Sequence, residues 1–201
     1  SGNVALAAGT TLTGSVILSA GGLVGALDSN ARTNIAITDA YATGAVSLAP
    51  VAGGQLRAGG LIGSANASAL RTYATGSVSA TGGSNRVTGG LAAQISGATV
   101  TLTSSYWDTE GTGQASTVGG GTGVSSASML QAATFDTWNV GSTGAGGSTW
   151  RIYEGFTRPL LRGLLTPITL SLADATKVYD GTTSFGNATV TAASGPVSNP
   201  E

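Results

Sequence analysis

The chain has 201 residues, of which 33 are glycine, 8% are charged and 5% are aromatic, and it contains neither histidine nor cysteine. These counts exclude a Ser-His-Asp or Cys-His catalytic triad, a thiolate nucleophile and an ordinary zinc site. Eight Lys and Arg against nine Asp and Glu give a net charge of −1, so we expect no basic surface for nucleic acid or an anionic membrane.

Hydrophobic residues make up 41% of the chain, which argues against disorder. Most of them are Ala, Val and Leu, which favours a fold of thin, repeated layers over a core filled by aromatic rings. No segment approaches 18 consecutive apolar residues, so we expect no transmembrane helix and no membrane insertion. The start Ser1-Gly2-Asn3 is neither a signal peptide nor an initiator methionine, and we expect the chain to be a piece of a longer polypeptide.

An internal repeat dominates the first half of the chain. Each copy begins with a Gly-Gly-Leu element and carries a tyrosine further on, and the tyrosines recur every 32 to 33 residues, a spacing typical of stacked-repeat proteins. If the repeats stack, equivalent tyrosines form a ladder along the axis, and the glycines occupy the corners where the chain turns. The repeat positions are Gly21, Gly22, Tyr41, Gly59, Gly60, Tyr73, Gly89, Gly90 and Tyr106.

Short segments in which Val, Ile, Thr and Leu alternate with small polar residues predict β-strands. We therefore predict an all-β fold, a right-handed parallel β-solenoid (β-helix) over residues 1–124, whose strands stack at about 4.8 Å. Each repeat is longer than one such turn, so each is expected to contain a loop. The predicted strands are Thr11–Leu18, Asn34–Thr38, Gly76–Ala80 and Ala98–Thr103, and the predicted loops are Ala26–Ala36, Pro50–Ala58 and Thr81–Arg86.

The C-terminal part, from residue 125 on, lacks the repeat and has a different sequence pattern. Residues 125–167 are predicted to close the solenoid, with one short helix in Ser125–Trp138 and a flexible loop at Gly141–Ser148. Residues 168–201 are predicted to begin a partial small β module, in which Ile168–Leu172 alternates as a strand and an Asp-Gly turn follows.

The Gly-Gly-Leu-(Val/Ile)-Gly element, followed by Tyr-Ala-Thr-Gly-x-Val, resembles the GLUG repeat of filamentous-haemagglutinin-like exoproteins of two-partner secretion systems. The segments Ser105–Gln114 and Trp150–Leu161 resemble the last-repeat block of those proteins, and Ala175–Thr183 resembles the start of a YDG/MBG-type module. The third repeat departs from the pattern, because Ala92-Ala93 replaces the usual hydrophobic-Gly pair.

This resemblance implies a secreted bacterial adhesin at the cell surface, a non-catalytic stalk or display scaffold with no cofactor. Its implied partners are an outer-membrane transporter and, through projecting loops, a host-cell or matrix glycan or a surface protein. A carbohydrate-active β-helix enzyme, a polysaccharide lyase or hydrolase, remains the alternative. A flat threonine array of the ice-binding kind is a third hypothesis, for which only Thr99–Thr103 provides a pattern.

Three neighbouring residues are the candidate binding residues. Asp108 and Glu110 stand at i and i+2, so on a strand both carboxylates leave the same face. They would suit an acid/base pair or a calcium ion, but calcium needs six or more oxygens, so we predict a turn with neither catalytic residues nor metal. If Tyr106 faces inward, Trp107 faces outward and offers a platform for a sugar ring, or packs under a loop.

Three further patterns have weaker functional meaning. The glycine run at Gly119–Gly123 is predicted to be a turn and not a phosphate-binding loop, since the chain's one lysine is Lys177. Asn66 and Asn187 match the glycosylation acceptor pattern. The densest charged patch is predicted to cover strand edges at the solenoid end, with a ligand site as the alternative; its members are Arg151, Glu154, Arg158 and Arg162.

Overall fold

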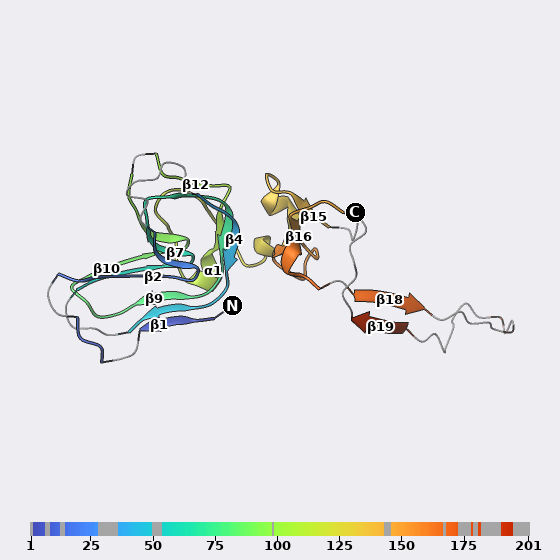
Figure 1. The fold of residues 1–201 in the computed structure, drawn as a ribbon, viewed down its shortest axis with the longest axis horizontal. Coiled ribbons are helices and arrows are strands. Elements are labelled where there is room, and N and C mark those ends of the chain that lie inside the picture. The colour runs from blue at the N-terminus through green and yellow to red at the C-terminus, as the bar shows by residue number, and fades with distance from the viewer. Residues whose placement is uncertain are drawn as a thin grey trace. The chain divides into compact units, whose positions relative to one another are not determined.

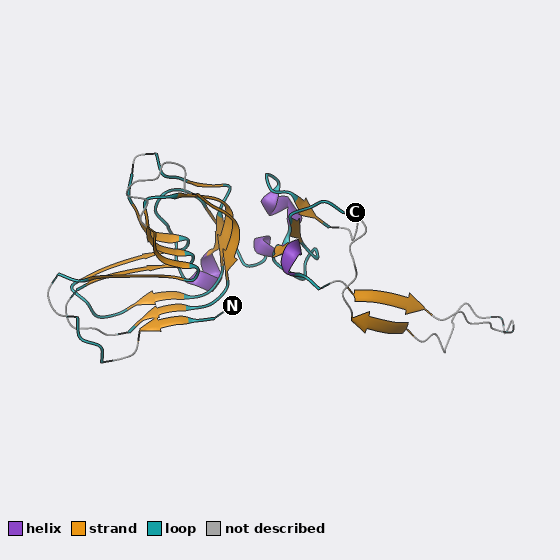
Figure 2. Cartoon of the chain, in the orientation of Figure 1, coloured by secondary structure: helices purple, strands orange, loops and turns teal. Residues whose placement is uncertain are grey.

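The chain divides into two compact units, Ser1–Arg162 and Gly163–Glu201, and each is described here by itself (Figure 1). Strands dominate both (Figure 2). The computed structural model describes residues 2–6, 9–12, 15–27, 36–49, 54–97, 99–142, 146–166, 168–172, 178, 181 and 190–194. Most of the loop predicted at Ala26–Ala36, and the start of that at Pro50–Ala58, lie outside these residues. The loop predictions are wrong at Gln55–Ala58 and at Asn85–Arg86, which form parts of strands.

The first unit repeats the same order of short strands. Each repeat contributes one strand before its glycine pair, one after it, one that carries the tyrosine and, in two repeats, one that follows. The strands are β1 (Val4–Leu6); β2 (Ile17–Gly21), β3 (Val24–Leu27), β4 (Ala36–Ala42) and β5 (Val46–Leu48); β6 (Gln55–Gly59), β7 (Ile62–Ala65), β8 (Ser68–Ala74) and β9 (Val78–Ala80); and β10 (Asn85–Gly89), β11 (Ala92–Ile95), β12 (Leu102–Thr103) and β13 (Tyr106–Asp108).

Strands at equivalent positions of successive repeats pair in parallel. The sheet orders are β1-β5-β9, β10-β6-β2 and β11-β7-β3, and β8 pairs with β4, β12 and β13. The register matches the sequence repeat, because Gly21 and Gly89 both lie opposite Gly59. The departure in the third repeat does not disturb the pairing, since Ala92 lies opposite Ile62. The observed fold is therefore all-β with parallel sheets, as predicted.

The paired glycines are needed for space. None of the six has a positive φ, so a sharp turn of the kind only glycine adopts is not the reason for their presence. A Cβ on Gly22 would overlap the carbonyl oxygen of Gly60, and a Cβ on Gly60 would overlap that of Gly90. Successive repeats approach so closely at this corner that only a residue without a side chain fits.

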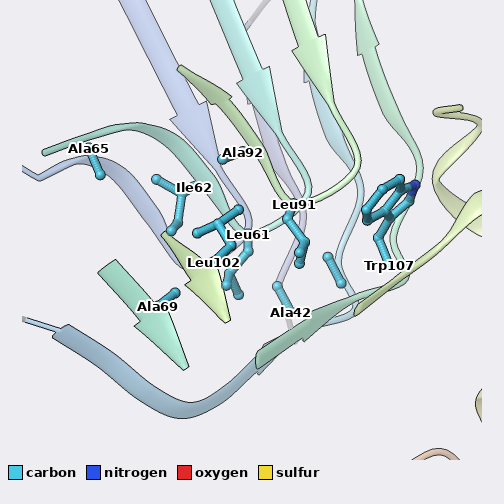
Figure 3. Packing of buried hydrophobic residues seen from close by; sticks show 10 residues of the cluster. Ala42, Leu61, Ile62, Ala65, Ala69, Leu91, Ala92, Leu102 and Trp107 are labelled. Atoms are coloured by element: carbon cyan, nitrogen blue, oxygen red, sulfur yellow. The ribbon is translucent and has the colours of Figure 1, made fainter. Parts of the chain in front are cut away.

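The interior is thin and largely aliphatic. One cluster of buried side chains contains Leu61, Ile62 and Leu91 together with several alanines and Trp107 (Figure 3). A second cluster, around Val46, Leu56 and Val78, fills the space between the other strands. A cavity of about 380 Å³ beside β1 and β2 is lined by uncharged residues, among them Val4, Leu18 and Leu48.

A turn of the chain after β13 covers one end of the stack. α1 (Thr109–Thr112) follows β13, and β14 (Thr122–Val124) then pairs in parallel with it. Between them Ser116 O accepts from Gly90 N–H, Gly119 O accepts from Leu102 N–H, and Thr117 Oγ1 accepts from the N–H groups of Leu91 and Ala92. These bonds occupy backbone donors that would otherwise mark an open sheet edge.

The segment from 125 to 162 completes the first unit. In place of the single short helix predicted in Ser125–Trp138, the chain forms two short 3₁₀ helices, η1 (Ser128–Leu130) and η2 (Ala132–Phe135). Gln131 between them is extended, with φ −111° and ψ 126°, which breaks the helix so that Met129 and Phe135 are both buried. A small sheet follows, of β15 (Val140–Gly141), β16 (Trp150–Arg151) and β17 (Leu160–Leu161), and then η3 (Arg162–Leu164).

The described residues of the second unit form an antiparallel strand pair. β18 (Ile168–Leu172) has the bounds predicted from its alternating sequence, and it pairs with β19 (Val190–Ser194). Most of the predicted Asp-Gly turn and of Ala175–Thr183 lies outside the described residues. In the parts of the chain that the structure describes, no helix has the length and apolar character that crossing a membrane requires.

Candidate functional site

The tyrosines of the repeats lie side by side on one face of the β4, β8 and β13 sheet. Tyr41 and Tyr106 are both paired with Tyr73, as the repeat spacing predicts. The rings of Tyr41 and Tyr73 stack with centroids 5.1 Å apart and planes within 6°. Tyr106 instead packs edge-on against Phe135, with ring centroids 5.1 Å apart. The tyrosine ladder is therefore stacked at one end and packs against residues C-terminal to β14 at the other.

The segment from 125 to 162, hereafter the cover, buries this face. Trp138 and Trp150 pack on one another at 4.7 Å and both contact Tyr73, whose side chain is fully buried. The Tyr73 hydroxyl donates to Pro159 O at 2.8 Å, which satisfies the polar end of the ring. Burial raises the pKa of the Tyr73 phenol well above its usual value, so it stays a neutral donor. The tyrosine face is thus an internal contact surface.

A column of strained backbone runs beside the tyrosines. Asp39, Arg71 and Ser104 each stand two residues before a ladder tyrosine, and their φ angles are +49°, +52° and +45°. This left-handed conformation costs a residue with a side chain of the order of 1–3 kcal/mol, so the surrounding contacts must hold it. Arg71 donates two hydrogen bonds to the Asp39 carboxylate, at 2.8 and 2.7 Å, and so links two repeats.

The same column holds the two indoles of the cover. Trp150 Nε1 donates to Asp39 Oδ1 at 2.9 Å, and Trp138 Nε1 donates to the carbonyl oxygen of Ser104 at 2.8 Å. The Arg71 hydrogen bond lowers the pKa of Asp39 against the opposing effect of burial, and the Trp150 bond lowers it further. Asp39 therefore stays ionised as the shared acceptor of a repeat–repeat bond and a repeat–cover bond.

Asp108 forms the second junction between the stack and the cover. Its carboxylate has no exposed surface and accepts from Gly111 N–H, Ser126 Oγ and Arg158 Nη2 at 2.8 Å each. Burial alone would raise the pKa of Asp108, but the bonds from Gly111, Arg158 and Ser126 outweigh it and lower the pKa. Asp108 is also the N-cap of α1, where a carboxylate accepts the free N–H groups of the first turn.

Glu110 and Asp108 both accept hydrogen bonds from Ser126. Glu110 Oε2 accepts from the backbone N–H of Ser126 at 3.0 Å, while Asp108 accepts from the hydroxyl of the same serine. Ser126 therefore links the two carboxylates. Among the described residues, no group of three Asp, Glu, His or Cys side chains is placed to hold a metal ion.

The expected outward orientation of Trp107 is wrong. Its side chain belongs to the same buried cluster as Leu61 and Leu91, and the residue is only 6% exposed (Figure 3). Gly90 and Gly123 make room for the indole, because a Cβ on either would clash with the ring. Its Nε1 donates to Gln114 O at 2.8 Å. Alternation along β13 was correctly expected, but it is Tyr106 that points away from the aliphatic interior.

The charged patch predicted near the end of the chain separates into different roles. Arg158 joins the Asp108 junction, and Glu154 Oε2 accepts from Ala132 N–H inside the cover. Asn66 lies in the turn between β7 and β8, with its N–H bonded to Leu27 O. Asn187 lies outside the described residues.

The bond between Asp39 and Arg71 was missed in the sequence, although a signal exists there. Opposite charges stand 32 residues apart, which is one tyrosine period, and each precedes a ladder tyrosine by two positions. By contrast, nothing local in the sequence indicates that Trp150 reaches Asp39, 111 residues away.

A search of family models, curated proteins and solved structures finds no match to this chain.

Proposed function

We propose that this chain is a segment of a secreted bacterial surface adhesin, in which a right-handed parallel β-solenoid serves as a stiff, non-catalytic stalk or display scaffold. The observation that carries the proposal is the in-register parallel pairing of successive repeats, from Gly21 through Gly59 to Gly89. Such stacking gives every strand the same neighbours above and below, and it builds a rod from short repeats. The likeness of the repeats to GLUG sequences supports placing this rod in a two-partner-secretion exoprotein.

The contacts of the cover support the proposal that this unit resists mechanical force. It bonds to the first repeat through Asp39 and to the third through Ser104, so one segment spans the stack along its axis. A force that separates neighbouring repeats must also detach the two indoles. In a simple array of repeats, each one can unfold with only its neighbours affected. Here we expect the three repeats and the cover to yield together.

Single-molecule force spectroscopy tests the scaffold proposal. With handles at residues 2 and 162, we expect one dominant rupture that releases about 500 Å of chain. The Trp150→Ala variant is expected to rupture at lower force in two or more steps, because the first repeat loses its bond to the cover. Stepwise unfolding of the unaltered chain at low force would contradict a stiff scaffold.

The enzyme alternative is tested in parallel by incubating the chain with acidic and neutral polysaccharides and measuring polymer length. The scaffold proposal expects no shortening. Of the Asp108 and Glu110 carboxylates, that of Glu110 is the exposed one. Cleavage that disappears in the Glu110→Gln variant would establish a carbohydrate-active enzyme instead.

A further inference from the structure

The small sheet β15-β16-β17 presents two arginines on the face opposite the tyrosines. Trp150 lies opposite Leu161, and both pack into the aromatic cluster, so these two side chains point inward. Successive side chains of a strand point to opposite faces, which places Arg151 on the outer face. Arg162 N–H donates to Thr149 O, so Arg162 is the next position of the ladder after Leu161. Its side chain therefore leaves the face opposite to that of Leu161, which is the outer face.

Three polar atoms on this outer face are shielded from solvent and have no hydrogen-bond partner among the residues that the structure describes. They are Arg151 Nη1, Arg162 Nη1 and Ser148 Oγ. Ser148 belongs to the same face because Gly141 is paired with Arg151, and a Cβ on Gly141 would lie 2.5 Å from Ser148 Oγ. Shielded donors without acceptors are uncommon in folded proteins and call for a ligand or ordered water.

Neither guanidinium group is paired with a carboxylate in the part of the chain that the structure describes. Among the described residues the ion pairs are Arg71–Asp39 and Arg158–Asp108, and the nearest acid in sequence, Glu154, is bonded to a backbone N–H of the cover. Arg151 lies opposite Leu160, and Arg162 is its diagonal neighbour two positions on, a relation that places Cα atoms about 7–8 Å apart. One carboxylate between the two arginines would accept from both.

Exposed aromatic rings stand beside the arginines. The Arg151 guanidinium lies over the Tyr153 ring, with its carbon 4.6 Å from the ring centre, an arrangement that restrains the side chain before any ligand arrives. Tyr153 is 48% exposed, and Phe156 across the following turn is 87% exposed. A cationic pair next to open ring faces matches a ligand that carries both a carboxylate and an apolar sugar face.

We propose that this outer face, formed by Arg151, Arg162, Ser148 and Tyr153, binds a uronic-acid unit of an acidic polysaccharide. The carboxylate bridges the two guanidinium groups, and the sugar ring packs against the exposed aromatic side chains. The proposal rests on the scaffold function and names its ligand class.

Isothermal titration of the full chain with galacturonate oligomers tests the site. We expect saturable binding that weakens with added salt, and no binding of neutral galactose oligomers. Arg162→Gln and Arg151→Gln are each expected to lower the affinity at least tenfold. The matched control is Arg86→Gln, because Arg86 is an exposed arginine on β10 whose Nη1 donates to Gly82 O. The affinity of this variant is expected to stay unchanged.

Near-UV circular dichroism of each variant confirms that the aromatic cluster is intact before the titrations are compared. Absence of saturable binding, or equal affinities of the Arg162→Gln and Arg86→Gln variants, overturns the proposal. Binding of a polyglutamate peptide as tight as that of the uronate oligomers also overturns it, in favour of an acidic protein partner. All of these outcomes leave the force measurement unaffected, so a failed ligand proposal is distinguishable from a failed scaffold proposal.

Discussion

At Asp108 one carboxylate is shared by two elements that fold from distant parts of the chain. Gly111 N–H belongs to the turn after β13, whereas Ser126 and Arg158 belong to the cover. Each hydrogen bond to a charged group contributes about 1.5–3 kcal/mol when the alternative is an unsatisfied buried group. Arg158 is 35% exposed, so solvent screens its share of the attraction.

Asp108→Asn is expected to lower the free energy of unfolding by about 2–3 kcal/mol at pH 7. The folded-state pKa of Asp108 lies below its ordinary value of 3.8, so its stabilisation is complete above that pH and is lost as the pH falls through the folded pKa. The difference between wild type and variant, measured by urea unfolding, should therefore shrink below about pH 4. Glu110→Gln is the control, and a loss as large as that of Asp108→Asn would contradict this assignment.

At the scale of elements, the cover and the tyrosine-bearing strands stabilise each other. The cover is not a sheet layer of its own, because its described residues form 3₁₀ turns and two-residue strands. What holds it is aromatic packing with Trp150 at the centre, in contact with Tyr41, Tyr73 and Trp138. A segment with so little regular secondary structure depends on that packing for its order.

Trp150→Ala is expected to lower the free energy of unfolding by about 3–5 kcal/mol, because it leaves a cavity and removes a bond to Asp39. Phe156→Ala is the matched control, since this equally aromatic residue of the cover is exposed and should change stability by less than about 0.5 kcal/mol. The measurement is thermal unfolding followed by near-UV circular dichroism. Equal effects of the two substitutions would show that the cover is not held by its indole.

At the scale of the whole first unit, the repeats are coupled through their closest approach. Gly60 stands in the middle repeat, between Gly22 and Gly90, and its N–H donates to Gly89 O. A side chain here would push apart backbones, which cannot rotate aside as a flexible side chain does. A substitution at Gly60 is therefore expected to displace the repeats on both sides.

Gly60→Ala is expected to destabilise the unit by about 3 kcal/mol or more and to raise amide hydrogen exchange in β2, β6 and β10 together. Gly146→Ala is the control, because a Cβ at Gly146 would meet nothing within 4 Å. Its effect on stability should stay within about 0.5 kcal/mol. Exchange that rises only in β6 would contradict the coupling of the repeats.

The sequence by itself determined the strand register, the parallel pairing of repeats and β18, and it placed the tyrosines in one ladder. The repeat features follow from the spacing of the repeats, because each repeat places its residues opposite the equivalent residues of the next one. Which side chains of a strand face the interior was harder to predict from the sequence. Trp107 and Tyr106 alternate as expected, yet the choice of which one faces the interior depends on what covers the other side.

Only the tertiary structure decided that choice. The cover makes the tyrosine face a buried one through contacts such as Trp150 to Asp39, which join positions 111 residues apart and leave no local pattern in the sequence. The Asp108 junction and the outer arginines have the same origin. Their chemistry depends on which faces are shielded from water, and long-range packing, not residue spacing, determines that.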